Sequence, residues 1–304
     1  MEVKQPTTYE QQIIKLRARG CQISDDGECQ KILQNVNYYR LTAYFLPFKK
    51  ADDTYFDVTI ERIYNIYEFD RKLRRILLTA IEEIEIKLRT RLAYYHSHEY
   101  GALGYKDSNN FNQKHKHELF ENKIKAEISN NRNVLYVKHH LENYEGQFPI
   151  WVAVELFTFG MLSFFFADLK GVDRRSVAEN DFAVNADVLQ SWLACCTDIR
   201  NICAHYGRLY YRRFSKFPKT PERYRQLSNT VFDYICIIKY LFPDKQRWNS
   251  ETLTALEALI NEYDGVIKLN HIGFPTNWTD LLNSTEKLDT TNNLVSTQMT
   301  TKKR

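Results

Sequence analysis

Glycine and proline, which most often interrupt regular secondary structure, are scarce in this 304-residue chain, with ten and seven residues. No stretch of any length alternates apolar and polar residues as a half-buried β-strand does, and no internal repeat is visible. The many Leu, Ile, Glu, Lys and Arg residues favour helix. These observations disfavour a sheet-rich protein and predict an all-α fold.

Paired cysteines are also missing. Six cysteines stand at positions 21, 29, 195, 196, 203 and 236, and none forms a CxxC pair, which argues against the common structural zinc sites. Cys195, Cys196 and Cys203 lie in an apolar helical stretch, so we expect buried free thiols in a reducing compartment. His115 and His117 have no Cys, Asp or His at ligand spacing. We expect neither a metal nor another cofactor.

The chain has no apolar run of membrane-spanning length. Its N-terminus, MEVKQPTTYEQQ, lacks the apolar segment of a secretion signal. The most apolar run, WVAVELFTFGMLSFFFADL, carries Glu155 and stops at Asp168, short of the roughly 20 apolar residues that a span needs. We therefore expect a cytoplasmic protein without a membrane partner.

The strongest periodic pattern predicts one long helix over residues 59–97. Its apolar stripe has helical spacing and consists of Leu73, Leu77, Ile81, Ile84, Leu88, Leu92 and Tyr95. Charged residues share the opposite side: Arg71, Arg75, Glu82, Glu85 and Arg89. We interpret that side as a solvated face with pairs such as Glu85 and Arg89 four residues apart.

Weaker signals predict the other helices. They cover residues 7–20, 25–37, 117–133, 150–168 and 250–264, and one runs from Pro221 to near Pro243. Asn185 is expected to cap a further helix that continues through residues 198–213. Residues 284–304 are polar and are expected to form a disordered tail. The predicted organisation is an N-terminal helical region (1–56), a core (57–245), a C-terminal helical region (246–283) and that tail.

The candidate site is the stretch RNICAHYGRLYYRR, residues 200–213. On a regular helix its apolar stripe would be Ile199, Ile202, Cys203, Tyr206, Leu209 and Tyr210. A second side would gather Asp198, Asn201, His205, Arg208 and Arg212. Arg200 would lie about 140° from His205 around such a helix. The two would meet only if Arg200 reaches around, if the helix is irregular there, or if the partner lies on another subunit.

These residue types suit cleavage of RNA without a metal. Histidine has the ordinary pKa nearest neutrality and can transfer a proton. Arginine holds a phosphate and stabilises charge that develops on it, and Asn201 can orient the imidazole or bond a phosphate oxygen. Spacing alone does not select this pair, because Arg91 with His96 and Arg132 with His139 show similar spacing. Gly207 is unusual for a helix interior; it marks either a bend or a close approach of backbone or substrate.

Several blocks in order support the motif. RNICAHYGRL resembles the RN-x-x-AH-x-x-R signature of HEPN-fold ribonucleases of the Abi-like (abortive infection, AbiD/AbiF type) family. TYEQQIIKLRARGCQI, VNYYRLTAYFLPF, FDRKLRRILLTAIEEIEIKLRTRLAYY, PIWVAVELFTFGMLS and GFPTNW resemble further blocks of that family. The resemblance covers roughly residues 7–280. It implies a HEPN-like helical bundle, here with N- and C-terminal helical extensions, which forms a homodimer.

The resemblance implies a toxin-like, metal-independent endoribonuclease of phage defence. Its catalytic residues would be Arg200, Asn201 and His205, and an antitoxin, either RNA or protein, would control it. Arg208 follows in the signature, and we expect it to bind RNA together with Arg212 and Arg213. From helical position alone, Asp198 is a candidate to orient His205. The alternatives are a nuclease-inactive RNA-binding helical dimer, which the basic stretch after the motif supports, and a purely structural helical dimer.

Overall fold

The computed structural model describes residue 3, residues 5–221 and residues 225–283. Within these ranges the chain forms α-helices and short 3-10 helices joined by turns and loops, and the only β-type pairings are isolated bridges such as that between Gln22 and Thr59. The all-α prediction is confirmed. None of the helices in the described part combines the length and the apolar character needed to cross a membrane. The predicted tail, residues 284–304, lies outside the described residues.

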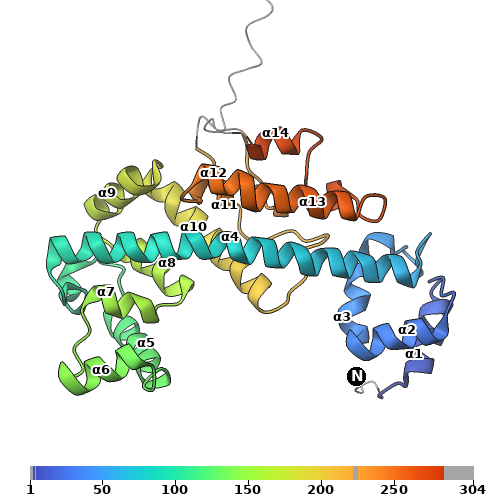
Figure 1. Ribbon diagram of the computed structural model, residues 1–304, viewed down its shortest axis with the longest axis horizontal. Helices are drawn as coiled ribbons and strands as arrows, with labels where there is room; N and C mark the ends of the chain where they lie inside the picture. Colours follow the sequence, from blue (N-terminus) through green and yellow to red (C-terminus); the bar gives the residue numbers. More distant parts are fainter. Residues whose placement is uncertain (1–2, 4, 222–224, 284–304) are drawn as a thin grey trace, which may run out of the picture.

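One helix organises the molecule. α4 (Ile60–Tyr100) has 41 residues and runs along nearly the whole length of the protein (Figure 1). The Thr59 side chain accepts a hydrogen bond from the N–H of Arg62 at its start, and Gly101 follows its last residue with a φ of +79°. The predicted boundaries, 59–97, are confirmed to within three residues. The stripe is buried, with Leu73, Leu77, Ile81, Ile84, Leu88 and Leu92 each at most 1% exposed. Burial of each such side chain stabilises the fold by about 1.5–3 kcal/mol.

The N-terminal helices pack at one end of α4. They are α1 (Tyr9–Ala18), α2 (Asp26–Asn35) and α3 (Tyr38–Thr42), followed by the 3-10 helix η1 (Ala43–Phe48). Thr8 and Gln11 form a reciprocal capping box at the start of α1, which explains the sharp beginning of that helix. The predicted helices 7–20 and 25–37 are confirmed, each one or two residues shorter at its ends.

The other end of α4 carries a second group of helices. These are α5 (His117–Asn130), α6 (Leu135–Asn143), α7 (Ile150–Ala153), α8 (Phe159–Asp168) and α9 (Gly171–Phe182). Here the predicted single helix over 150–168 is wrong, because η4 (Val154–Leu156) and an extended Phe157 interrupt it. Thr158 caps α8, and the Arg89 guanidinium binds the carbonyl oxygens of Val154 and Phe157. α6 and α9 were not predicted.

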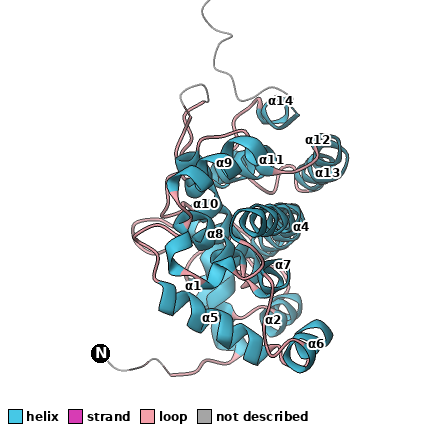
Figure 2. Cartoon of the chain, turned by 90° about the vertical axis from the view of Figure 1, so that its left-hand side faces the viewer, coloured by secondary structure: helices cyan, strands magenta, loops and turns pink. Residues whose placement is uncertain are grey.

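Several of the remaining helices contact α4. α10 (Ala186–Ala204) contacts α4, α8, α9 and α11 (Val231–Leu241), and Figure 2 shows it beside α8 and the end-on α4. α12 (Lys245–Arg247), η5 (Trp248–Leu253), α13 (Thr254–Glu262), η6 (Leu269–Ile272) and α14 (Trp278–Asn283) follow. The prediction of a helix from Pro221 is wrong, because that helix begins at Val231 with Thr230 as its cap. The predicted helix over 250–264 corresponds to parts of η5 and α13.

Candidate functional site

α10 brings the motif to the surface. Asn185 caps its first turn, as predicted, by accepting a hydrogen bond from the N–H of Val188 at 2.8 Å. Ile199 and Cys203 face the core and are 0% and 2% exposed. Arg200 and Asn201 therefore emerge on sides of the helix that the core does not cover.

The helix ends at the histidine of the motif. His205 is the C-cap of α10, and Tyr206 follows in the left-handed region with a φ of +59°. The N–H of Tyr206 binds the Cys203 carbonyl at 3.1 Å, and the N–H of Gly207 binds the Ile202 carbonyl at 2.7 Å. This pair of bonds is a Schellman motif. The predicted continuous helix over 198–213 is therefore wrong, and Tyr206, expected in the buried stripe, is 69% exposed.

Gly207 suits this helix end because a side chain there would be crowded. A Cβ atom on Gly207 would lie 3.0 Å from the Cγ2 atom and 3.1 Å from the carbonyl oxygen of Ile202. Both possibilities considered for this glycine hold, since the chain bends here and a backbone approaches closely.

A buried carboxylate from α4 holds the segment that follows the turn. The Asp70 side chain is 0% exposed and accepts hydrogen bonds from the N–H groups of Leu209 at 3.0 Å and Tyr210 at 2.6 Å. It also accepts a hydrogen bond from the Tyr44 hydroxyl at 2.7 Å and pairs with Arg74, four residues along α4. Burial raises the pKa of Asp70, and the Arg74 guanidinium and the three hydrogen-bond donors oppose that rise. The network explains why the chain leaves the helix at this point.

Two arginines bind the carbonyl groups of the turn itself. The Arg40 guanidinium donates to the carbonyl of Tyr206, and Arg74 donates to that of Gly207 at 3.3 Å. The left-handed Tyr206 backbone costs about 1–2 kcal/mol, and these bonds offset that cost. Sequence reasoning missed this network, although Asp70 gives one signal: it lies between Phe69 and Leu73, at a position that helical spacing assigns to the apolar stripe.

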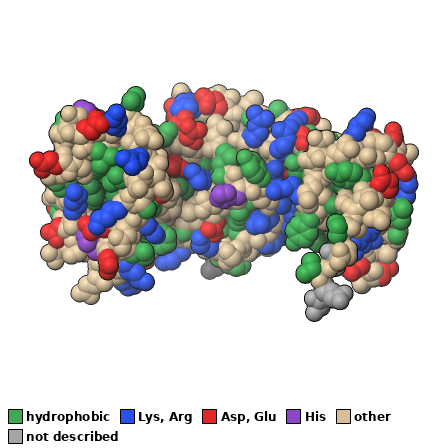
Figure 3. Space-filling model, turned by 90° about the horizontal axis from the view of Figure 1, so that it is seen from below, with side chains coloured by type: hydrophobic (Ala, Val, Ile, Leu, Met, Phe, Trp, Pro, Cys, Tyr) green, Lys and Arg blue, Asp and Glu red, His purple; other side chains and the backbone are tan. Residues whose placement is uncertain are grey.

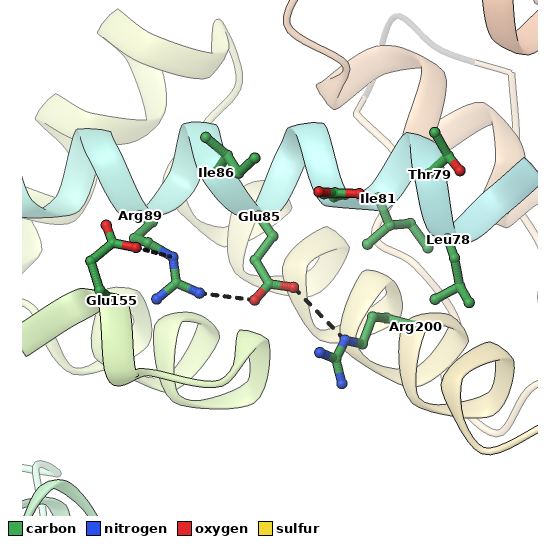
Figure 4. A pocket seen from close by; sticks show the side chains of 9 residues that line it. Leu78, Thr79, Ile81, Glu85, Ile86, Arg89, Glu155 and Arg200 are labelled. Carbon is green, nitrogen blue, oxygen red and sulfur yellow. Dashed lines mark hydrogen bonds and ion pairs between the residues drawn. The ribbon is translucent and has the colours of Figure 1, made fainter. Parts of the chain in front are cut away.

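Arg200 lines an open cleft of about 490 Å³ between α4, η4 and α10. Its Nε atom lies 3.8 Å from the Glu85 Oε2 atom, and one terminal nitrogen lies 3.5 Å from the side-chain oxygen of Asn201. Figure 4 shows Glu85 between Arg200 and Arg89, with Glu155 beyond Arg89. The expected pair of Glu85 with Arg89 is present at 3.0 Å, but both side chains are largely buried, so this part of α4 is not the solvated face that we interpreted.

The other motif residues have separate surroundings. His205 is exposed, and its side chain makes no hydrogen bond, ion pair or ring contact within the described part of the chain. Asn201 is also exposed. Asp198, the candidate to orient His205, instead pairs with Lys216 at 2.6 Å. The structure thus brings Arg200 and Asn201 together and leaves the imidazole of His205 free of both within one chain.

The three arginines expected to bind RNA differ in exposure and in hydrogen-bond partners. Arg208 turns inward and donates to the carbonyl groups of Tyr210 and Tyr211, and burial lowers its pKa. Arg212 donates through Nε to the carbonyl of Arg208 at 2.8 Å, whereas Arg213 is exposed. Arg208 therefore holds the backbone that follows the turn, and Arg213 is the most exposed of the three.

All six cysteines are buried and free, as predicted for Cys195, Cys196 and Cys203. Burial raises the pKa of the Cys203 thiol to about 12. His96, which shares a spacing similar to the motif with Arg91, is completely buried, so its position excludes it as a surface site. Across residues 5–221 and 225–283, no three or more His, Cys, Asp or Glu side chains are grouped to hold a metal ion.

The fold and this helix end define an all-α protein with an exposed Arg–Asn–His motif. A family model described as "Abi-like protein" matches residues 31–211, which is more than half of the chain and includes α4, α10 and the motif. The chain belongs to this Abi-like family. Comparison with curated proteins found no match, and comparison with solved structures found none either.

Proposed function

We propose that this protein is a metal-independent endoribonuclease of HEPN type that acts as a toxin in abortive infection, a form of phage defence. Membership of the Abi-like family supports the biological setting. The observation that carries the chemistry is the placement of two motif residues. Arg200 lines an open cleft, and His205 stands exposed at the end of α10 with an imidazole that nothing in the described chain engages.

The proposed reaction uses the ribose of the substrate as its nucleophile. The 2′-oxygen forms a bond to the adjacent phosphorus, and the bond from phosphorus to the 5′-oxygen breaks, which leaves a 2′,3′-cyclic phosphate and a 5′-hydroxyl. The 2′-hydroxyl loses its proton and the departing 5′-oxygen gains one, and His205 takes part in this proton transfer. Arg200 holds the phosphate and stabilises its developing charge, and Asn201 bonds a phosphate oxygen or orients the imidazole. DNA, which lacks the 2′-hydroxyl, would not be cut.

The geometry favours a site shared by two chains. Arg200 is turned toward Glu85 on α4, whereas His205 projects from the end of α10. In a homodimer, Arg200 of one chain and His205 of the other would act on one phosphate. RNA is the proposed substrate, and an antitoxin of RNA or protein is the proposed controller.

The surface around the motif fits an anionic substrate. Lys and Arg side chains gather across the middle of the lower face of the molecule (Figure 3). Exposed cations follow the motif at Arg213, Lys216 and Lys219. Phosphate contacts of this kind give affinity without sequence specificity and weaken as salt increases.

Labelled RNA incubated with purified protein in EDTA tests the proposal. We expect cleavage products that end in a cyclic phosphate. His205→Ala should lower the cleavage rate by about 10²–10⁴-fold, because proton transfer is lost, and should leave the melting temperature nearly unchanged, because the side chain is exposed. His139→Ala is the matched control: it is exposed and follows Arg132 at similar spacing. Wild-type rates in His205→Ala would contradict the assignment.

The alternative is a nuclease-inactive RNA-binding helical dimer. The observation that favours it is a set of exposed rings among the cations, at Tyr206, Tyr211 and Phe217. Such rings stack on unpaired bases. Salt-sensitive RNA binding without any cleavage would support this alternative.

A further inference from the structure

The position of the Arg200 side chain is unusual for a residue that would act beside His205. Arg200 is 34% exposed and extends along the cleft with its Nε atom facing Glu85 of α4 (Figure 4). Its two contacts are weak by geometry, since one is 3.8 Å long, to Glu85, and the other is 3.5 Å long, to Asn201. Its second terminal nitrogen has no partner among the described residues. Glu85 and Asn201 therefore orient the guanidinium, but they leave it able to donate further hydrogen bonds.

The carboxylate that directs it is held firmly. Glu85 is 16% exposed, and its Oε1 atom accepts a hydrogen bond from Arg89 at 3.0 Å, so only Oε2 faces Arg200. Arg89 is fixed in turn by the carbonyl groups of Val154 and Phe157. The position of Oε2 is thus set by α4 and by the break between α7 and α8, not by Arg200.

We infer that Glu85 is a positioning residue that orients the Arg200 guanidinium toward the phosphate, an inference that rests on the proposed ribonuclease function. The lining of the cleft holds two guanidinium groups and three carboxylates: Arg89, Arg200, Glu82, Glu85 and Glu155. Arg89 faces Glu85 and Glu155, whereas Arg200 faces Glu85 alone, so Arg200 is the cation that can offer free nitrogens to a phosphate. Arginine has a long flexible stem, and contact with a fixed carboxylate oxygen limits the directions in which its terminal nitrogens point. Phosphate then binds to the terminal nitrogens that Glu85 leaves open.

A carboxylate in the cleft also has an unfavourable effect, because it carries the same charge as the substrate. Glu85 repels a phosphate that approaches the cleft, so its removal should not weaken RNA binding. Loss of orientation instead lowers the rate of the chemical step, because small displacements of a group that stabilises the transition state reduce rates strongly. The inference therefore predicts a fall in kcat with an unchanged or lower KM.

The experiment compares Glu85→Gln with Glu82→Gln in cleavage of labelled RNA. Glutamine keeps the shape and the acceptor oxygen for Arg89 but removes the charge that attracts Arg200. Glu82 lines the same cleft one turn earlier on α4, is exposed and has no partner among the described residues, so its variant controls for charge alone. For Glu85→Gln we expect kcat to fall about tenfold while KM stays level or drops. Glu82→Gln should keep the wild-type kcat, and both variants should melt near the wild-type temperature.

The outcomes separate the inference from the proposed function. Equal kcat values for the Glu85→Gln and Glu82→Gln variants of an active enzyme would overturn the inference alone. A rise in KM with an unchanged kcat in Glu85→Gln would overturn it too, because Glu85 would then serve binding. Wild-type protein that cuts no RNA would overturn the proposed function and the inference with it. Partial recovery of kcat in Glu85→Asp, which restores the charge on a shorter side chain, would support the positioning role.

Discussion

Two carboxylates of α4, Asp70 and Glu85, act on the same motif segment in different ways. Asp70 is 0% exposed and binds the backbone after the turn, together with the buried guanidinium of Arg74. Glu85 is 16% exposed and reaches the half-exposed Arg200 at the edge of an open cleft. The first carboxylate determines where the helix ends, and the second acts on a side chain that keeps access to solvent.

The difference follows from desolvation. A buried charge is very unfavourable without its partners, so a buried pair cannot lose one member without a large loss of stability. The pair of Glu85 with the half-exposed Arg200 is screened by water and contributes little to stability, typically about 0–1 kcal/mol. Arg89, which is 12% exposed, also contacts Glu85, but it keeps Glu155 at 3.9 Å and two carbonyl groups as partners when Glu85 loses its charge. Asp70 is therefore expected to matter for folding, whereas Glu85 is expected to matter for the reaction.

Asp70→Asn is expected to have the largest effect. It leaves the Arg74 guanidinium buried without a counter-charge. It also replaces one of the two acceptor oxygens by an NH2 group, although every partner of Asp70 is a hydrogen-bond donor. We expect the free energy of unfolding to fall by about 3–5 kcal/mol, measured by urea denaturation. Glu85→Gln provides the comparison and should lose less than about 1 kcal/mol. Similar losses in both variants would remove the distinction between the two carboxylates.

His96, farther along α4, is a third titratable residue of this helix, and it makes stability depend on pH. Burial lowers its pKa from 6.5 to about 4, and both ring nitrogens lack hydrogen-bond partners. The unfolded chain therefore binds a proton on this residue more readily than the folded chain. The stability contributed by neutral His96 is complete above pH 6.5 and is lost as the pH falls toward 4. The loss reaches about 3 kcal/mol.

Urea denaturation at a series of pH values measures this effect. His96→Leu should flatten the dependence of stability on pH between about 6.5 and 4. His98→Leu, two residues later and exposed, should leave that dependence as in the wild type. If His96→Leu retains the full slope, other groups account for the acid sensitivity.

Gly207→Ala is expected to have the smallest effect and tests the turn that Asp70 holds. The added methyl group would meet the side chain and the carbonyl of Ile202, so we expect the free energy of unfolding to fall by about 1–2 kcal/mol. Gly171→Ala is the control, because a Cβ atom there meets nothing within 4 Å. Thermal melting of both variants gives the answer, and equal Tm values would show that the helix end tolerates a side chain.

The sequence predicts those helices and caps that depend on residues close to one another in the chain. The apolar stripe of α4 and the Asn185 cap of α10 could be read from spacing and residue type, because each involves neighbours in sequence. The free buried cysteines followed from the same apolar spacing. The break within residues 150–168 could not be read in this way, since Arg89 stabilises it from a different helix.

The end of α10 shows the same limit at the candidate site. Helical spacing placed Tyr206 in the core and Arg208 beside His205, but both placements assumed that the helix continues. It ends because Asp70 binds the N–H groups of Leu209 and Tyr210 from a distant part of the sequence. The sequence allows an irregular helix at this point, but it does not identify Asp70 as the residue that causes the irregularity.

Because α4 is unbroken, it fixes the spacing between the two carboxylates that act on the motif. Asp70 and Glu85 lie about four helical turns apart on the same rigid rod, so the distance between the fixed turn and the orientation of Arg200 is set by the number of residues between them. Inserting one residue in that interval would rotate everything beyond it by about 100°, and Glu85 would leave the cleft. A change of length between these two carboxylates would therefore separate the position of the turn from the orientation of Arg200.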